Sequence, residues 1–229
     1  MSNLKPVAIN AHYIRVGYQG RSTAVARVVI VNDEQKLLHD IYIRPDEGLF
    51  EIPSFEDEYI FKKVKNGLNP LQAAEIIAQH LKPHIVVGQD LVNLLDDLKV
   101  TSIYENRIRD LRKYSKVQLL YPGGAMLDSN VSIQRMAHEI LGATYPTGCD
   151  KVVEDAINMM RLYKLAAPTW EAEIKSQSSI LSTWRPATTH QAQQESEGFS
   201  WGALAAGAAA AGFTILTAKY ASNQRRNRE

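Results

Sequence analysis

The order of apolar segments in the first 165 residues constrains the fold most strongly. Three runs rich in apolar residues come first, at 6–13, 24–32 and 37–44, and only a short polar turn separates the second from the third. Runs of this length and composition predict β-strands, and the short connection predicts that the second and third pair antiparallel. The chain is therefore expected to begin with an antiparallel meander.

The segments after this meander alternate between helical and strand patterns. Asn69 followed by Pro70 predicts a helix start, and Pro83 its end. The expected elements are, in order, a helix from 70 to 82, a strand at 84–88, a helix at 90–98, an edge segment at 108–110, a helix at 133–141 closed by Gly142, and a helix at about 151–165. Three antiparallel strands followed by alternating helices and strands predict an RNase H-like α/β fold.

A second feature divides the chain near its C-terminus. No charged side chain occurs from Gly198 to Ala218, and a basic segment at 219–229 follows directly. About 20 uncharged residues is the length that an α-helix needs to cross a bilayer. Trp201 and Tyr220 stand near the two ends of the run, where amphipathic rings prefer the membrane interface. The run therefore predicts a transmembrane helix, and a buried Ala-rich helix of a soluble domain is the alternative.

This span sets the expected domain organisation. The expected parts are a folded domain at 1–175, a polar linker at 176–198, a membrane anchor at 199–218 with Phe199 and Ala218 as its ends, and a basic tail at 219–229. The N-terminus lacks the pattern of a secretory signal, and the single cysteine, Cys149, fits a reducing compartment. We therefore expect a tail-anchored protein whose domain faces the cytosol.

The sequence of the anchor indicates which membrane it enters and suggests that two anchors associate. A modestly apolar span with a basic flank resembles the tails of mitochondrial outer-membrane proteins, with peroxisome and endoplasmic reticulum as alternatives. Small residues stand four apart, as Ala203 with Gly207 and Ala208 with Gly212. Because this spacing lets two helices approach closely, self-association through the anchor is a hypothesis.

The charge distribution bears on the class of partner. The chain carries a formal net charge of +1, and residues 219–229 carry four basic side chains and one acidic one. Residues 1–198 therefore sum to −2. A domain that holds phosphate backbones by electrostatics is usually clearly basic, so the charge does not favour nucleic acid as the partner.

Several segments of the domain carry a family pattern. They are Ala8–Gly17 (AINAHYIRVG), Ser22–Asn32 (STAVARVVIVN), Tyr42–Pro45 (YIRP), Val86–Leu95 (VVGQDLVNLL), Arg109–Tyr114 (RDLRKY) and Asp150–Leu165 (DKVVEDAINMMRLYKL). In order and spacing, over roughly residues 5–175, they resemble the DEDDh 3′–5′ exonucleases of the RNA exonuclease 4 and interferon-stimulated 20-kDa exonuclease group. The resemblance implies an RNase H-like fold and a metal-dependent RNA exonuclease.

The resemblance also places the family's metal ligands and general base. The four acidic ligands fall at Asn10, His12, Leu94 and Asp155, and the general-base histidine falls at Asp150. Two-metal catalysis needs hard oxygen ligands around Mg²⁺ or Mn²⁺, and only Asp155 keeps its carboxylate. We therefore expect no catalytic residue and no bound metal or other cofactor; Mg or Mn enters only if the chain is an active enzyme.

Other acidic residues offer alternative ligands. Asp90, Asp96 and Asp97 lie near Leu94 in sequence, and Asp90 and Asp97 could share its helical face. The family itself often carries an aspartate at the Asp90 position without using it as a ligand.

Other residues are considered as metal ligands, as a nucleophile or as structural charges. His12 with Asp150 and Asp155 could form a transition-metal site, although a lone histidine at such a position is more often a hydrogen-bonded residue. Cys149 is expected to be a small buried residue rather than a nucleophile. Asp110 is expected to act as a helix cap and Glu154 as a solvated charge.

A short basic cluster lies in the segment FKKVKNG. Lys62, Lys63 and Lys65 are expected to form a solvated face rather than an RNA-binding track.

These observations predict a catalytically inactive exonuclease-fold adaptor that is tethered to a membrane and recruits a protein partner through the old substrate groove. The alternatives are a membrane-anchored RNA-binding protein and a 3′–5′ RNA exonuclease with non-standard metal ligands. The surroundings of Asn10 and Asp155 separate two of these: a basic rim favours RNA, whereas an apolar or acidic rim favours a protein.

Overall fold

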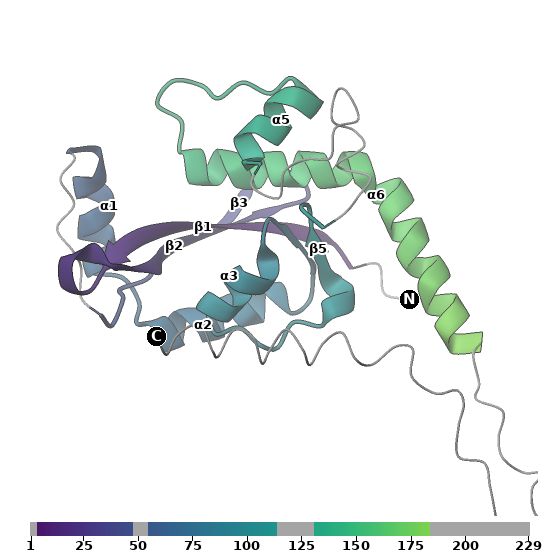
Figure 1. Ribbon diagram of the computed structural model, residues 1–229, viewed down its shortest axis with the longest axis horizontal. Coiled ribbons are helices and arrows are strands. Elements are labelled where there is room, and N and C mark those ends of the chain that lie inside the picture. The colour runs from purple at the N-terminus through teal and green to yellow at the C-terminus, as the bar shows by residue number, and fades with distance from the viewer. Residues whose placement is uncertain (1–3, 48–54, 114–130, 184–229) are drawn as a thin grey trace, which may run out of the picture. The chain divides into compact units, whose positions relative to one another are not determined.

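A five-stranded mixed sheet forms the centre of the domain (Figure 1). The computed structural model describes residues 4–47, 55–113 and 131–183. Within these residues the strands are β1 (Pro6–Val16), β2 (Ser22–Asn32), β3 (Leu37–Tyr42), β4 (Ile85–Gly88) and β5 (Ile108–Asp110), in the order β3-β2-β1-β4-β5. The first three pair antiparallel, while β4 is parallel to β1 and to β5. The prediction of an RNase H-like α/β domain is confirmed.

The α-helices of the described residues are α1 (Phe55–Lys65), α2 (Pro70–Leu81), α3 (Leu91–Asp97), α5 (Ile133–Leu141) and α6 (Lys151–Thr183), and α2 and α5 begin at a side chain that caps them. The Asn69 side chain accepts a hydrogen bond from the Gln72 N–H at 2.9 Å, so the predicted start of α2 is confirmed. Gly142 adopts φ +63° at the end of α5, the left-handed conformation that glycine reaches without steric cost.

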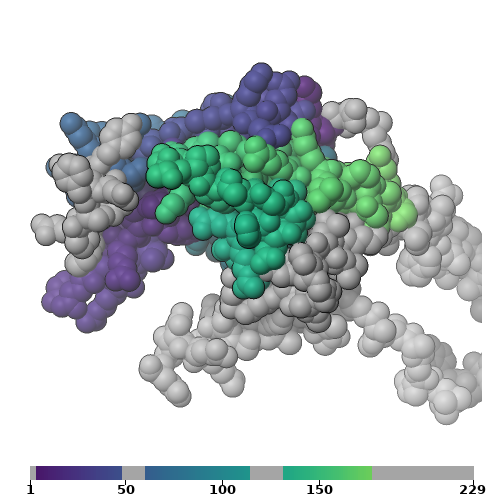
Figure 2. Space-filling view, turned by 90° about the horizontal axis from the view of Figure 1, so that it is seen from above, coloured from purple at the N-terminus to yellow at the C-terminus, as the bar shows by residue number. Residues whose placement is uncertain are grey.

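Two apolar layers cover the two faces of the sheet. On one face, Ile9, Ile30 and Ile77 belong to a buried cluster that joins the strands to α2 and α3. On the other face, Ala8, Val29 and Met160 belong to a cluster that joins the strands to α5 and α6. Figure 2 shows α5 and α6, in teal and green, lying against each other on this second face. Alternate residues of β1 thus face different helical layers.

Two helices differ from their predicted extent. Helix α1 was not predicted. Of its side chains that the structure describes, only that of Val64 is buried. Helix α6 was predicted to end near Leu165, but it continues through Pro168 to Thr183. Figure 1 shows the axis of α6 changing direction along its length. A proline removes one backbone hydrogen bond and bends a helix, which accounts for the change.

The predicted membrane anchor lies outside the described residues. Within the described part of the chain, none of the helices is both long and apolar enough to span a bilayer.

Candidate functional site

Asn10 stands where the family has its first acidic ligand, and its side chain joins β1 to α6. The Asn10 Nδ2 atom donates a hydrogen bond to the backbone carbonyl of Val152 at 3.0 Å. This carbonyl lies in the first turn of α6, so the bond connects strand and helix across 142 residues of sequence. An aspartate could not make the same bond, because an ionised carboxylate only accepts. The amide at this position therefore has a structural use that a metal ligand would not have.

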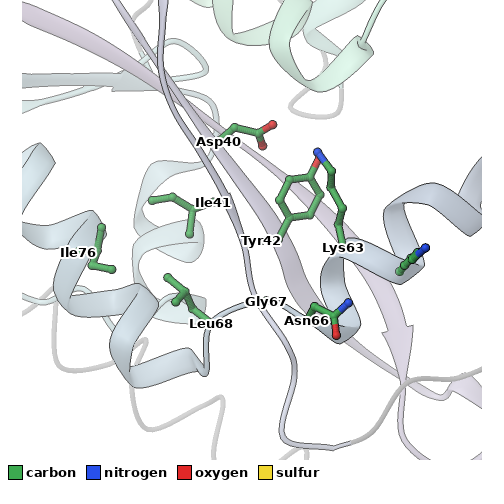
Figure 3. Close-up of a pocket in the computed structure, with 9 residues that line it drawn as sticks. Asp40, Ile41, Tyr42, Lys63, Asn66, Gly67, Leu68 and Ile76 are labelled. Atoms are coloured by element: carbon green, nitrogen blue, oxygen red, sulfur yellow. The ribbon is translucent and has the colours of Figure 1, made fainter.

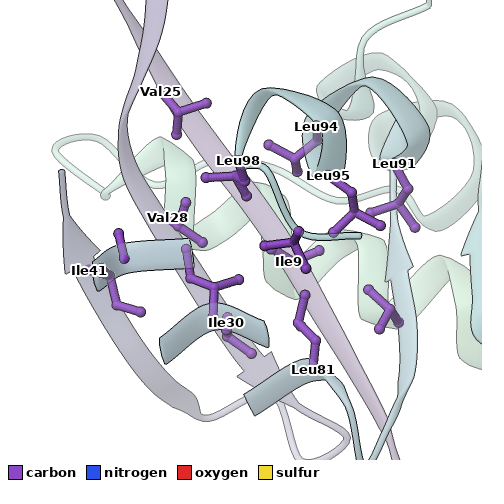
Figure 4. Close-up of a cluster of buried hydrophobic side chains, with 14 of the residues drawn as sticks. Ile9, Val25, Val28, Ile30, Ile41, Leu81, Leu91, Leu94, Leu95 and Leu98 are labelled. Atoms are coloured by element: carbon purple, nitrogen blue, oxygen red, sulfur yellow. The ribbon is translucent and has the colours of Figure 1, made fainter. Parts of the chain in front are cut away.

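Leu94 stands where the family has its second-motif aspartate, and it lies in the core. Its side chain is 6% exposed and belongs to the same buried cluster as Ile9 and Leu98 (Figure 4). Helix α3 presents one apolar face to the sheet, formed by Leu91, Leu94 and Leu95. The side chain at this position cannot ligate a metal, and its burial contributes about 1.5–3 kcal/mol to stability.

Asp150 stands where the family has its general-base histidine, and it is held in an ion pair. Its Oδ2 atom lies 2.7 Å from Nη2 of Arg27, whose side chain is 4% exposed. Arg27 also donates to both oxygens of Asp40, at 2.6 and 3.0 Å. The Asp150 Oδ1 atom accepts from the Val152 and Val153 N–H groups at the start of α6. Burial alone would raise the pKa of Asp150, but the Arg27 guanidinium and these N–H groups lower it.

Asp155 is the ligand position that keeps its carboxylate, and a tyrosine binds it. The Tyr145 hydroxyl donates to Asp155 Oδ1 at 2.6 Å. Burial raises the pKa of Asp155, the Tyr145 hydrogen bond acts in the opposite direction, and the nearby Glu154 charge raises it further. Burial and Asp155 likewise raise the pKa of Tyr145. One oxygen of this carboxylate is thus already engaged by a protein donor.

These positions do not form a metal-binding set. Among the described residues, no group of three or more histidine, cysteine, aspartate or glutamate side chains could hold a metal ion. In the alternative site of His12, Asp150 and Asp155, both carboxylates already have protein partners: Asp150 pairs with Arg27, and Asp155 accepts from Tyr145. His12 itself is half-buried in β1, next to a register shift between His12 and Tyr13.

A cavity of about 380 Å³ opens beside Asn10, and we call it the β1–α3 cleft. Its described lining is Asn10, Ala11, Tyr13, Gln89, Asp90, Asn93, Leu94 and Asp97. The Tyr13 hydroxyl donates to Asp97 Oδ2 at 2.9 Å, and Asn93 donates to both oxygens of Asp90. Burial, with the Asp97 hydrogen bond and charge, raises the pKa of Tyr13.

The three aspartates considered as alternative ligands near Leu94 differ in their position relative to the β1–α3 cleft. Asp90 and Asp97 line the β1–α3 cleft, whereas Asp96 is exposed and lies outside its lining. Two carboxylates with hydrogen-bonding tyrosine and asparagine neighbours make this cleft acidic. Its charge is the opposite of what a phosphate backbone requires.

Arg27, Tyr145 and Tyr13 were not predicted as site residues. Arg27 and Tyr13 contact Asp150 and Asp97, which are distant in sequence, so no local spacing identifies them. Tyr145 lies ten residues before Asp155, but the loop between them gives no periodic pattern that would reveal the contact.

Two predictions about single residues have clear outcomes. Asp110 was predicted to cap a helix, and this is confirmed: its carboxylate accepts from the Asp90 and Leu91 N–H groups, both at 3.2 Å. Cys149 was predicted to be buried but is only partly so.

Comparisons with known proteins agree with this architecture. The chain is similar to RNA exonuclease 4 from Candida glabrata, with 27% identity over 169 residues, covering 74% of this chain and 62% of that protein. It is also similar to RNA exonuclease 4 from Mus musculus, with 29% identity over 189 residues, covering 82% and 40%. The chain therefore spans only part of the curated relatives it matches. No protein-family model matches it.

A solved structure supports the fold. The chain resembles the Neurospora crassa Pan2 catalytic unit, which contains a protease and a nuclease domain, with a TM-score of 0.53 and 18% identity, covering 80% of this chain and 30% of that one. At this identity the likeness concerns the fold alone. With the sequence relatives, it confirms the resemblance to the DEDD-type exonucleases.

Proposed function

We propose that this chain is an exonuclease-fold domain that does not cleave nucleic acid by a two-metal mechanism, and that it works by binding a protein partner at a membrane. One observation carries the proposal: side chains at two of the family's ligand positions and at its general-base position are engaged in holding the fold. Asn10 bonds to the backbone of α6, Leu94 packs in the core, and Asp150 pairs with Arg27.

The chemistry of phosphodiester cleavage supports the absence of activity. Two-metal nucleases place two divalent ions between carboxylates, where one ion activates water and both stabilise the charge that develops on the phosphate. Mg²⁺ requires oxygen ligands in nearly octahedral geometry. A single carboxylate, Asp155, which already accepts a hydrogen bond from Tyr145, cannot supply such a site. The names of the relatives make RNA exonuclease activity the alternative to be tested.

The lining of the β1–α3 cleft supports a protein partner over RNA. Asp90 and Asp97 contribute negative charge, and among the described residues no lysine or arginine lines the cavity. Arg112 lies 3.6 Å from Asp90, so it offsets part of this charge without reversing it. An RNA backbone would meet repulsion here, whereas a basic side chain of a protein would meet attraction.

A cleavage assay tests the proposal. The full-length chain is incubated with 5′-labelled single-stranded RNA and Mg²⁺ or Mn²⁺, and the shortening of the RNA and its retention on a filter are measured over a range of salt concentrations. We expect no shortening beyond that given by the Asp155→Asn variant and no salt-sensitive retention. Asp96→Asn, which removes an exposed carboxylate of α3 outside the cleft, is the matched control. Shortening that Asp155→Asn abolishes and Asp96→Asn preserves would establish an active exonuclease.

The membrane part of the proposal rests on the uncharged run from Gly198 to Ala218 and its basic flank. We place the anchor in the mitochondrial outer membrane because a modestly apolar span followed by arginines resembles the tails found there. The small-residue spacing within the run supports self-association of the anchor as a further element of the proposal.

A localisation experiment tests the anchor. A fluorescent protein fused to the N-terminus of the full chain is expected to mark a membrane and to resist alkaline extraction, because a spanning helix is not released by removing electrostatic contacts. The same fusion ending at Glu197 is expected to be diffuse and fully extractable. Equal distribution of the two fusions would rule out the anchor, and marking of peroxisomes or endoplasmic reticulum would correct the organelle alone.

A further inference from the structure

A second cavity lies at the opposite edge of the sheet from β5, beside strand β3. Its volume is about 700 Å³, and we call it the edge groove. Its described lining includes Ile41 and Tyr42 from β3, Lys62 and Lys63 from α1, Leu68 from the following turn and Ile76 from α2. The edge groove shares no lining residue with the β1–α3 cleft, so an inference about it does not depend on the function proposed above.

The edge groove has an apolar side and a polar side. Figure 3 shows Ile41, Leu68 and Ile76 gathered on one side, with Tyr42 and Lys63 adjacent to each other on the opposite side. This division follows from the pleat of β3, because successive side chains of a strand point to opposite faces of the sheet. A strand added beside β3 would have the same pleat. Its side chains would therefore meet the apolar side and the polar side alternately.

Among the described residues, the outer edge of β3 upstream of Tyr42 has no strand paired with it. In the described sheet β3 is the outermost strand, and its one partner strand is β2. After Tyr42 the edge is already paired, because the Leu68 N–H donates to the Tyr42 carbonyl at 2.9 Å. Gly67 permits this approach, since a Cβ atom at that position would lie 2.5 Å from the same carbonyl oxygen. Backbone groups alternate in direction along a strand, so those of Asp40 face the same side as the Tyr42 carbonyl.

The charge of the edge groove is positive. Lys62 is exposed, and the Lys63 ammonium lies 4.8 Å from the centre of the Tyr42 ring. The one acidic side chain in the described lining is Asp40, and its charge is offset by two hydrogen bonds from Arg27. An acidic occupant is therefore favoured over a basic one.

From these observations we propose that the edge groove binds an extended acidic segment of a partner protein, which pairs with β3 as an additional strand. Its backbone bonds to the outward groups of β3 upstream of Tyr42. Its apolar side chains pack on Ile41 and Ile76, and its carboxylates face Lys62 and Lys63. Main-chain pairing supplies affinity in this mode of recognition, and alternating side-chain contacts supply specificity.

A peptide titration tests this proposal. The probe is a fluorescein-labelled octapeptide of alternating glutamate and valine, and its fluorescence anisotropy is followed with the full-length chain. We expect the double variant Lys62→Glu, Lys63→Glu to weaken binding by about tenfold or more, since attraction becomes repulsion at both positions. The matched control, Lys113→Glu with Lys164→Glu, makes the same change of net charge at two exposed lysines outside the groove, and it should alter the affinity less than twofold.

Changes in the probe separate strand pairing from charge attraction. A peptide with every second amide N-methylated keeps its carboxylates but loses donors to β3, and we expect it to bind at least tenfold more weakly. A peptide with lysine in place of glutamate should not bind. Equal affinity of the N-methylated peptide, or of the two double variants, would overturn the proposal. So would displacement of the peptide by single-stranded RNA, or a dimer of the chain that the Lys62→Glu, Lys63→Glu variant dissociates.

Discussion

Replacement of Leu94 by aspartate is expected to lower the free energy of unfolding by about 3–5 kcal/mol without creating nuclease activity. The substitution restores the residue type that the family has at this position, but the side chain here is 6% exposed and packs against the sheet. It removes buried apolar contacts, which costs about 2–5 kcal/mol for comparable truncations. It also moves a carboxylate into surroundings that provide no charged partner among the described residues of its cluster. Urea unfolding followed by circular dichroism at pH 7 measures the loss.

Helix α3 provides its own control for this experiment. Val92→Asp introduces the same carboxylate two residues earlier, where the side chain is 52% exposed. We expect this variant to lose less than about 1 kcal/mol, because most surface substitutions have small effects. If Leu94→Asp were no more destabilising than Val92→Asp, the packing assigned to Leu94 would be wrong. Mg²⁺-dependent cleavage of RNA by Leu94→Asp would show that the old metal site is still accessible.

Much of the sheet and several helices could be predicted from local sequence. The runs that form β1 and β2 are recognisable because buried strands concentrate β-branched residues, and β3 is recognisable from the short polar turn that joins it to β2. The start of α2 and the end of α5 could be predicted because Asn69 and Gly142 act through their immediate neighbours. These features depend on residues a few positions apart, which is the range over which a single sequence is informative.

The extent of α6 could not be predicted in the same way. Pro168 reads as a helix end, yet the helix continues and places Glu171 beside β5. Arg109 donates to both oxygens of Glu171, at 2.7 and 2.9 Å, and the Tyr163 hydroxyl donates to one of them at 2.9 Å. These contacts stabilise the part of the helix beyond the proline. The contact between Arg109 and Glu171 joins residues 62 positions apart, so tertiary structure overrides the local signal.

Helix α1 left a weak signal in the sequence. Its first turn carries Glu56, Asp57 and Glu58, and its last turn carries Lys62, Lys63 and Lys65. Acidic residues at the start and basic residues at the end complement the helix dipole, so this charge order favours a helix. The lysines were predicted to form a solvated face. Lys62 and Lys65 are exposed and Lys63 is half-buried, but the position of Lys62 and Lys63 beside β3 was not predicted.

The candidate site was predictable in its residues but not in their contacts. The resemblance identified Asn10 and Leu94 as substituted ligand positions and Asp150 as the substituted general-base position. Nothing in the sequence links Asn10 to the carbonyl of Val152 or Asp150 to Arg27, because each partner is more than 100 residues away. The contacts that give the substituted residues a structural use therefore emerge only from the fold.

The second large effect is expected at Arg27, where replacement by methionine should lower the free energy of unfolding by about 2–4 kcal/mol at pH 7. The arginine side chain is 4% exposed and pairs with both Asp40 and Asp150. Removal of one partner of a buried ion pair costs about 3–5 kcal/mol. The expected loss is smaller here because the two carboxylates are 27% and 44% exposed and keep part of their hydration. Methionine retains most of the packing volume, so the loss reports mainly the charges.

The pH dependence of the unfolding free energy lost in Arg27→Met shows whether the loss comes from the ion pair with Asp150. The folded-state pKa of Asp150 lies below its ordinary value of 3.8, since Arg27 and the N–H groups of α6 outweigh the effect of burial. A carboxyl group with a lowered pKa contributes stability that is complete above its unfolded pKa and is lost as the pH falls through the folded one. The difference between wild type and Arg27→Met should therefore be constant from about pH 7 to 5 and shrink below about pH 4.

A double-mutant cycle separates the ion pair with Asp150 from other consequences of removing Arg27. Asp150→Asn keeps a side-chain oxygen for the first turn of α6 but removes the charge that Arg27 neutralises. Adding Asp150→Asn to Arg27→Met should recover about 1 kcal/mol, because an unpaired carboxylate is then no longer left beside β2. Strictly additive effects of the two substitutions would show that Arg27 and Asp150 do not interact. A loss that persists unchanged at pH 3 would assign the role of Arg27 to packing, and the structural use of Asp150 would then be confined to its hydrogen bonds at the start of α6.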